Sequence, residues 1–168
     1  MVVGATPQVL PRKSYAGWIR RVLAAVVDGL PVFVVTVIGW GVLLGDRDKA
    51  CLPDPSPYDI APLCSSGATT AGQLAVPISA LIALAFLLWN IGYRQGRTGR
   101  SIGKSLLGFV VLSEKTWQPV GFGRSIVRQL AHILDALPCW VGFLFPLWDS
   151  KRQTLADKMM STVCVPDR

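Results

Sequence analysis

The strongest constraint on the fold is an apolar run at residues 22–44, which is interrupted only by Asp28 and Pro31. At a rise of about 1.5 Å per residue, a helix of this length crosses a hydrocarbon core about 30 Å thick. A second run, at residues 73–92, contains no acidic or basic residue and is also long enough to span. The chain is 51% hydrophobic and only 16% charged, a balance typical of integral membrane proteins. We therefore expect an all-α membrane protein with two full transmembrane helices.

The start of the first run returns later in the chain. Residues 19–31 read IRRVLAAVVDGLP and residues 126–138 read IVRQLAHILDALP, with seven of thirteen positions identical. Each copy holds an arginine seven positions before an aspartate, and the pairs are Arg21 with Asp28 and Arg128 with Asp135. On a helix such a pair shares a face about 10 Å apart, too far to bond within one helix. We interpret the segments as two copies of one element; the alternative is a chance likeness between helices rich in Leu and Ala.

Basic residues are unevenly distributed along the chain, whose formal net charge is +7. Residues 1–21 carry four basic and no acidic side chains, residues 92–128 carry seven and one, and residues 46–71 carry two and four. By the positive-inside rule the first two segments are expected in the cytoplasm and the third outside. The basic excess then faces anionic lipid headgroups, and we expect the lipid bilayer, not nucleic acid, as the partner.

We expect a single membrane domain at residues 15–165, because the chain is only 168 residues long, has few charges and is rich in apolar runs. The first span is too long for a signal-peptide core and is expected to stay as an uncleaved anchor. The flanking segments are a disordered N-terminus at residues 1–14, an outside loop at 46–72, a cytoplasmic segment at 93–125 and a tail at 166–168.

A third hydrophobic segment, at residues 126–148, has basic residues at both ends and prolines inside it. Basic residues at both ends favour a re-entrant helical hairpin, bent near Pro138, whose two ends stay in the cytoplasm. A third full span with the tail outside is the alternative. The β-prone run at residues 108–112 is expected to form a surface strand. If the third segment is a hairpin, this run and a second one at 162–165 lie on the same side of the membrane and can pair as a small cytoplasmic sheet.

Two of the four cysteines, Cys51 and Cys64, lie in the outside loop, where an oxidising environment favours a disulfide. Two free thiols are the alternative. The single histidine and the scattered cysteines lack the paired spacing of a metal site, so we expect no metal and no cofactor.

Carboxylates at membrane depth cost about 2.5–3.5 kcal/mol each near the centre of a span, so they require partners. We expect Asp28 to pair with Arg128 or Lys104, and Asp135 to pair with Arg21 or Arg124. The alternative to a functional centre is that such pairs only lock the helices together. Asn90, at the inner end of the second run, is expected to bond to another helix.

His132 lies between Arg128 and Asp135 on one helical face. Because imidazole titrates near neutral pH, these three side chains form a candidate proton relay. A hydrogen-bonded polar residue beneath the membrane interface is the alternative reading of the histidine.

The sequence Gly103-Lys104-Ser105 resembles the end of a phosphate-binding loop. A phosphate-binding loop needs a glycine at the position of Thr98. Such a loop also follows a strand, whereas the segment in this chain follows a membrane helix. We therefore exclude nucleotide binding. The basic residues of this segment are expected to form an interface loop instead: Arg94, Arg97, Arg100 and Lys104.

Three parts of the chain together resemble the RDD family of small bacterial membrane proteins. They are Arg21 with Asp28, the run GRSIGKSLLGFVV at residues 99–111, and RQTLADK at 152–158 followed by TVCV. The family is named after one arginine and two aspartates, which the resemblance assigns to Arg21, Asp28 and Asp157. The chain departs from the pattern at Ala156, where a histidine is common, and in an extra Arg-Ser before Gly103.

The resemblance implies a multi-pass protein of the bacterial plasma (inner) membrane with a cytoplasmic N-terminus, and transport of an unidentified ligand. We expect transport of protons, ions or a small ligand by an oligomer, since two spans cannot enclose a path. A non-catalytic accessory or scaffold subunit that docks a larger membrane complex is the alternative. No enzymatic activity is expected, because no residue set has the context of a hydrolase. The candidate transport residues are Arg21, Asp28, Arg128, His132, Asp135 and Asp157.

Overall fold

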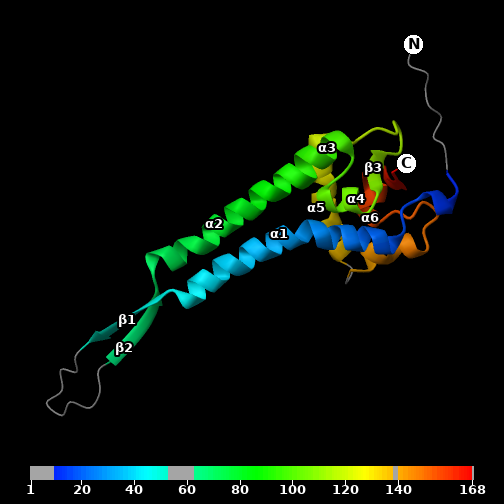
Figure 1. Cartoon of the computed structure of the whole chain (residues 1–168). Helices are drawn as coiled ribbons and strands as arrows, with labels where there is room; N and C mark the ends of the chain where they lie inside the picture. Colours follow the sequence, from blue (N-terminus) through cyan, green and yellow to red (C-terminus); the bar gives the residue numbers. More distant parts are fainter. Residues whose placement is uncertain (1–9, 53–62, 138–139, 168) are drawn as a thin grey trace. The chain divides into compact units, whose positions relative to one another are not determined.

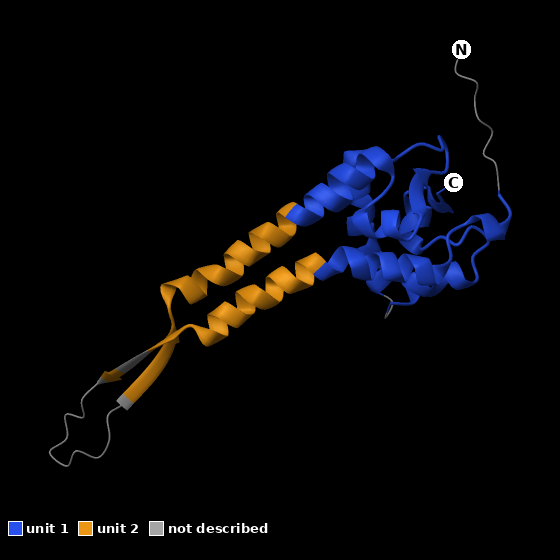
Figure 2. Ribbon diagram, viewed as in Figure 1, with its two compact units in different colours: residues 1–30, 86–168 blue, residues 31–85 orange. Residues whose placement is uncertain are grey.

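The computed structural model describes residues 10–52, 63–137 and 140–167. The chain divides into two compact units, one of residues 31–85 and one of residues 1–30 and 86–168 (Figure 2). Most of the predicted disordered N-terminus lies outside the described residues. Within the remainder, Arg12–Ser14 form a short 3-10 helix, so the expected disorder does not extend to them.

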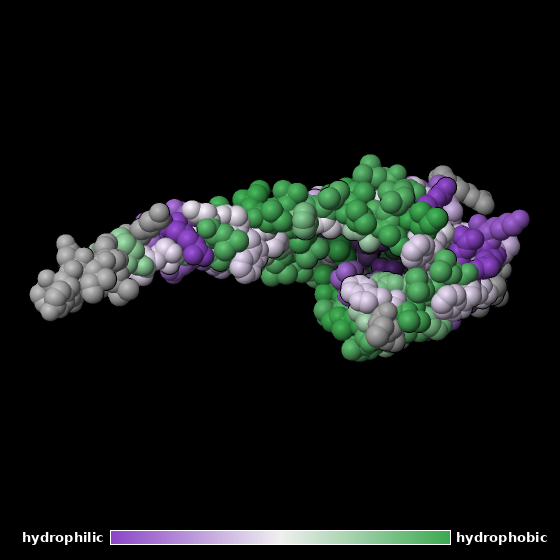
Figure 3. Space-filling view, turned by 90° about the horizontal axis from the view of Figure 1, so that it is seen from below, coloured by the Kyte–Doolittle hydropathy of each residue, from purple (hydrophilic) through white to green (hydrophobic). Residues whose placement is uncertain are grey.

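Two helical stretches, Arg12–Gly45 and Thr70–Thr98, are long and apolar enough to cross a membrane. This confirms the expectation of two candidate spans. The first consists mainly of α1 (Trp18–Gly45), and the second joins α2 (Thr70–Leu87), the π-helical η2 (Leu88–Arg94) and α3 (Gln95–Thr98) (Figure 1). Hydrophobic residues cover the two long helices on the face shown in Figure 3, as expected for surfaces that contact lipid.

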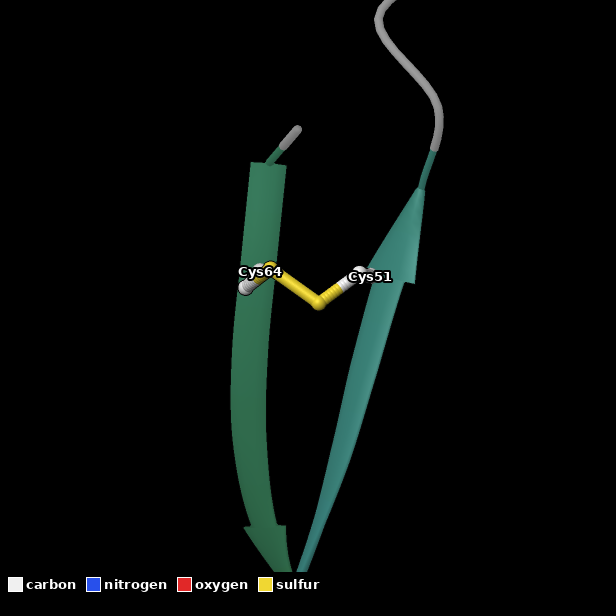
Figure 4. Close-up of a disulfide and its surroundings, with 2 residues drawn as sticks. All are labelled: Cys51 and Cys64. Carbon is white, nitrogen blue, oxygen red and sulfur yellow. A yellow bond between two sulfur atoms is a disulfide. The ribbon is translucent and has the colours of Figure 1, made fainter. Parts of the chain in front are cut away.

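The unit of residues 31–85 contains a β-hairpin that the sequence did not predict. Strands β1 (Arg47–Leu52) and β2 (Leu63–Ala68) pair antiparallel, with Cys51 opposite Cys64 in the register. A disulfide joins the two cysteines, which confirms the expected bridge (Figure 4). The proline-rich part of the predicted loop, residues 53–62, lies outside the described residues.

In the same unit, α1 and α2 approach closely at Gly39. A Cβ atom added to Gly39 would lie 2.2 Å from Ser79 Oγ and 3.0 Å from the carbonyl oxygen of Ala75. Small residues allow such contact between membrane helices, whose association depends on packing and not on the hydrophobic effect. Gly39 and Ser79 therefore allow these two helix segments to pack closely against each other.

The other unit contains a small sheet formed by β3 (Phe109–Ser113) and β4 (Thr162–Pro166), which pair antiparallel with Val111 opposite Cys164. This confirms the pairing expected of the two β-prone runs. The expectation of a surface strand is wrong, because Phe109 and Val111 are fully buried in a core that includes Ala16, Ala24 and Cys164. The sheet packs against helical segments, so one of its faces points into the core of the unit.

Helix α5 (Phe122–Ala136) buries its polar residues and exposes its apolar ones. Ser125, Arg128 and Asp135 are buried, whereas Leu130 and Ile133 are each 59% exposed. This pattern is the reverse of a helix at a water-exposed surface. It suits a helix whose outer face contacts lipid.

The third hydrophobic segment consists of α5 and a 3-10 helix, η3 (Val141–Leu147), which are inclined at 101° to each other. The expected bend at Pro138 falls on residues 138–139, outside the described part of the chain. A bent pair of this kind fits both alternatives of the sequence, a re-entrant hairpin and a broken span.

Candidate functional site

The centre of the polar network is the carboxylate of Asp157, on the short helix α6 (Leu155–Met159). Asp157 Oδ1 accepts hydrogen bonds from Arg128 Nε at 2.9 Å and Nη2 at 2.6 Å, and Oδ2 accepts one from Arg21 Nη1 at 2.6 Å. Thr162 Oγ1 donates to Oδ1 at 3.1 Å. One fully buried carboxylate thus binds two guanidinium groups, one from α1 and one from α5.

These contacts correct the crossed pairs expected between the two sequence copies. The pairing of Asp28 with Arg128 and of Asp135 with Arg21 or Arg124 is wrong, because both arginines of the repeated element turn to Asp157. The other partner expected for Asp28 is correct, since Lys104 Nζ lies 3.8 Å from its Oδ2. Helical periodicity placed the charges on suitable faces but did not locate α6 between them.

Asp28 binds the start of helix α4 (Ile102–Leu106). Its Oδ1 accepts hydrogen bonds from the Gly103 amide at 2.7 Å and Asn90 Nδ2 at 2.8 Å, and its Oδ2 accepts one from Ser101 Oγ at 2.5 Å. The bond from Asn90 confirms its expected role as a link to another helix. Asn90 belongs to the π-helical η2, and π-helical turns occur frequently at functional sites.

Asp135 binds the start of α6 in a similar way. Its Oδ1 accepts hydrogen bonds from the amides of Leu155 at 2.8 Å and Ala156 at 3.3 Å. A hydrogen bond of 2.6 Å joins its Oδ2 to His132 Nδ1, and the imidazole stacks on Phe143 with ring centroids 5.5 Å apart. Of the three expected relay members, His132 and Asp135 therefore meet, whereas Arg128 turns away to Asp157.

The two copies of the sequence element have the same structural role. Each aspartate accepts from at least one amide in the first turn of a short helix whose N-cap is a hydroxyl residue, Ser101 or Thr154. Each short helix leads into one strand of the same antiparallel pair. The structure therefore supports the repeat over a chance likeness. The copies differ at the third residue of the short helix, which is Lys104 in one and Asp157 in the other.

A cavity of about 610 Å³ lies beside this network. Its volume is in the range of small-molecule sites. Apolar side chains make up most of its wall, including Val22, Phe109 and Phe143. Its charged lining residues are Arg21, Asp28, Lys104 and Arg128, and the side chains of His132 and Cys164 also line it.

Arg21 carries buried donors without a partner. Its Nε and Nη2 atoms have no hydrogen-bond acceptor among the described residues. An unsatisfied buried donor costs about 1–3 kcal/mol. Arg21 is thus held by one strong ion pair while the rest of its guanidinium group remains unsatisfied next to the cavity.

Lys104, the cation beside Asp28, is expected to make stability depend on pH. Burial and the charge of Arg128 lower its pKa from 10.5 to about 8, although Asp28 opposes the shift. Between pH 8 and 10.5 the unfolded state then binds the extra proton, so stability rises with pH across this window. Lys104→Met should flatten the rise of the melting temperature in mild detergent. Lys115→Met, at an exposed position after β3, should leave the rise intact.

The RDD family profile matches residues 15–161 of the 168-residue chain. The chain belongs to the RDD family. It is therefore an RDD-family membrane protein with two helices that are long and apolar enough to span a bilayer.

The RDD relatives include two mycobacterial proteins. The chain is 54% identical over 159 residues to the "Proline-rich antigen homolog" of Mycobacterium tuberculosis (strain ATCC 25618 / H37Rv), an alignment that covers 95% of this chain. It is 51% identical over 163 residues to the "Proline-rich antigen" of Mycobacterium leprae (strain TN), covering 97% of this chain. The chain spans 66% of the length of each relative, slightly less than two thirds. No solved structure matches the chain.

The basic residues expected to form one interface loop of this RDD protein have separate roles. Arg94 Nη2 donates to Ser105 Oγ at 3.1 Å, Arg97 stacks over the ring of Tyr93, and Arg100 pairs with Asp167 at 2.5 Å. Lys104 belongs to the buried network. These four side chains therefore do not form a single basic surface.

The N-cap residues Ser101 and Thr154 were missed by the sequence analysis. A signal for them was present, because Thr154 stands three residues before Asp157 and the two form a capping box. Recognising it requires expecting a helix of only five residues.

Proposed function

We propose that this RDD protein moves protons, small ions or a small ligand across the membrane through its buried Arg/Asp centre. The observation that carries the proposal is the cavity of about 610 Å³, whose wall combines apolar side chains with Arg21, Asp28, Lys104 and Arg128. Ionisable residues at membrane depth are costly and commonly mark ion or substrate paths. The hydrogen bond between His132 and Asp135 provides a titratable group near the same cavity.

The proposed activity is not enzymatic, and the proposed partners are the lipid bilayer and further copies of the chain. Two spanning helices cannot surround a path by themselves, so the proposal includes a homo-oligomer. Nucleic acid has no part in it. The location in this proposal is the bacterial plasma membrane.

The proposed orientation places the N-terminus in the cytoplasm and the β1–β2 hairpin outside. The disulfide between Cys51 and Cys64 supports this side, because disulfides persist in oxidising compartments. In intact cells, a membrane-impermeant maleimide should label the hairpin cysteines only after reduction, and should not label a cysteine introduced at the exposed position Lys115. Labelling at position 115 from outside would invert the orientation.

The transport proposal is tested by flux into liposomes that contain the purified full chain. A pH-sensitive dye inside the vesicles should report proton movement when a Na⁺ or K⁺ gradient is imposed. Asp28→Asn should abolish the signal, because Asp28 lines the cavity, whereas Asp167→Asn, on an exposed ion pair, should not. Absence of flux from the folded wild-type protein under both gradients would contradict proton-coupled transport and favour the accessory-subunit alternative.

A further inference from the structure

A second cavity, of about 470 Å³, lies at the start of α1. It shares only Trp18 and Pro146 with the first cavity. Four cationic side chains line it, and no acidic residue does: Arg12, Lys13, Arg20 and Arg152. The proposed transport centre does not use any of these four cations.

The positive charge of this second cavity is not neutralised by the surrounding protein. None of its four cations forms a salt bridge with a described residue, whereas Arg21, Lys104 and Arg128 in the first cavity all lie near carboxylates. Four cations around one hollow repel each other and favour an anion between them. The wall also includes residues at the start of α1, where the helix dipole adds to the attraction.

Two of the three guanidinium groups are held in place by the backbone of neighbouring segments. Arg12 Nη2 donates to the carbonyl of Leu147, and Arg152 Nη1 donates to the carbonyl of Tyr15 at 3.2 Å. Arg152 has a φ angle of 51°, a conformation uncommon for a non-glycine residue. A Cβ atom on Gly17 would lie 3.3 Å from Arg152 Nη1, so the glycine leaves room for this guanidinium.

An apolar stripe runs along α1 from the same cavity. Ile19 lines the cavity and is 66% exposed, and Leu23, Val26 and Leu30 follow it on one helical face with about half of each side chain exposed. This is the arrangement that an amphiphile requires, with cations for its head and an apolar surface for its chains. A free inorganic anion would use only the cations.

We propose that this cavity binds the phosphate of an anionic phospholipid whose acyl chains lie along α1. The cations lie where the candidate span Arg12–Gly45 begins, the level at which headgroups meet a membrane helix. Zwitterionic lipids carry the same phosphate, but their own cation competes with the protein's basic residues. The site therefore distinguishes lipids by headgroup charge and does not depend on the proposed transport activity.

The test compares phosphatidylglycerol, phosphatidylcholine and inorganic phosphate as probes for the purified full chain in a neutral detergent. Titrations followed by native mass spectrometry measure the affinity for each lipid, and thermal unfolding measures stabilisation by each probe. Phosphatidylglycerol should bind more tightly than phosphatidylcholine. Lys13→Gln with Arg20→Gln should weaken it roughly thirtyfold, since each basic residue near an anionic headgroup contributes a factor of about five. Both side chains are exposed and make no hydrogen bond with described residues, so the variant should fold.

The matched control is Lys115→Gln with Arg124→Gln, which removes the same charge at exposed positions outside the cavity. It should leave the affinity for phosphatidylglycerol within a factor of two or three, as expected for distant surface charges. An equal loss in the control would show that only net charge matters, which would overturn the proposal. Equal binding of the two lipids, or stabilisation by inorganic phosphate as strong as that by phosphatidylglycerol, would also overturn it.

Discussion

Asp157→Asn should lower the stability of the protein by about 3–5 kcal/mol, because it leaves two buried guanidinium groups without their anion. Arg128 and Arg21 both bind this carboxylate, at distances of 2.6–2.9 Å. Burial alone would raise the pKa of Asp157, but the charges of Arg128 and Arg21 outweigh it and hold the pKa well below its ordinary value. Unfolding in mixed micelles titrated with SDS, followed by tryptophan fluorescence, measures the loss.

The same substitution at Asp167 is the matched control. Asp167 pairs with Arg100, and the two side chains are 31% and 39% exposed, so Asp167→Asn should cost less than about 1 kcal/mol. Combining Asp157→Asn with Arg128→Gln should cost less than the sum of the two single losses, because one stranded charge is removed. Simple additivity would show that Arg128 is not energetically coupled to Asp157.

Gly103→Ala should be the second most damaging change, at about 3 kcal/mol, from overpacking together with the loss of a charge-assisted hydrogen bond. A Cβ atom on Gly103 would lie 2.1 Å from the carbonyl oxygen of Ala24, and neither the oxygen nor the α1 backbone can move aside. Helix α4 must then withdraw from α1, which breaks the 2.7 Å bond from the Gly103 amide to Asp28. The SDS titration should show this as a lower midpoint.

Gly123→Ala is the matched control for Gly103→Ala. Nothing lies within 4 Å of a Cβ at Gly123, in the first turn of α5. Alanine there should be neutral or stabilise the helix by up to about 1 kcal/mol. If Gly103→Ala is equally harmless, the close approach of α4 to α1 does not occur in the folded protein.

The glycine, lysine and serine at residues 103–105 match the end of a phosphate-binding loop but have a structural role in this protein. The sequence excluded a phosphate-binding loop because Thr98 replaces a required glycine. The structure supplies the reason for Gly103, which is its contact with α1 beside Asp28. Lys104, expected in a basic loop or as a partner of Asp28, reaches the carboxylate because it lies one residue beyond this contact.

The spans and the disulfide could be predicted from the sequence because their signals are local, whereas the pairing of β3 with β4 was expected only because the two β-prone runs were placed on the same side of the membrane. Length and apolarity mark a spanning helix, and two cysteines in one loop are close along the chain. The repeated Arg-x6-Asp element was visible for the same reason. By contrast, the β1–β2 hairpin was missed, because strands of charged and small residues carry little strand signal.

The sequence by itself determined that both arginines and both aspartates of the repeat needed partners, since a charge in an apolar segment cannot remain alone. Only the tertiary structure decided which partners they found. Asp157 lies 136 positions from Arg21. Its helix α6 is held in place by hydrogen bonds from the backbone amides of Leu155 and Ala156 to Asp135. Helical periodicity determines the face on which a charge lies but not which distant segment approaches that face. The contact of two arginines with one carboxylate is therefore a property of the packed unit, in which Asp28 and Asp135 bind the amides of short helices far away in the sequence.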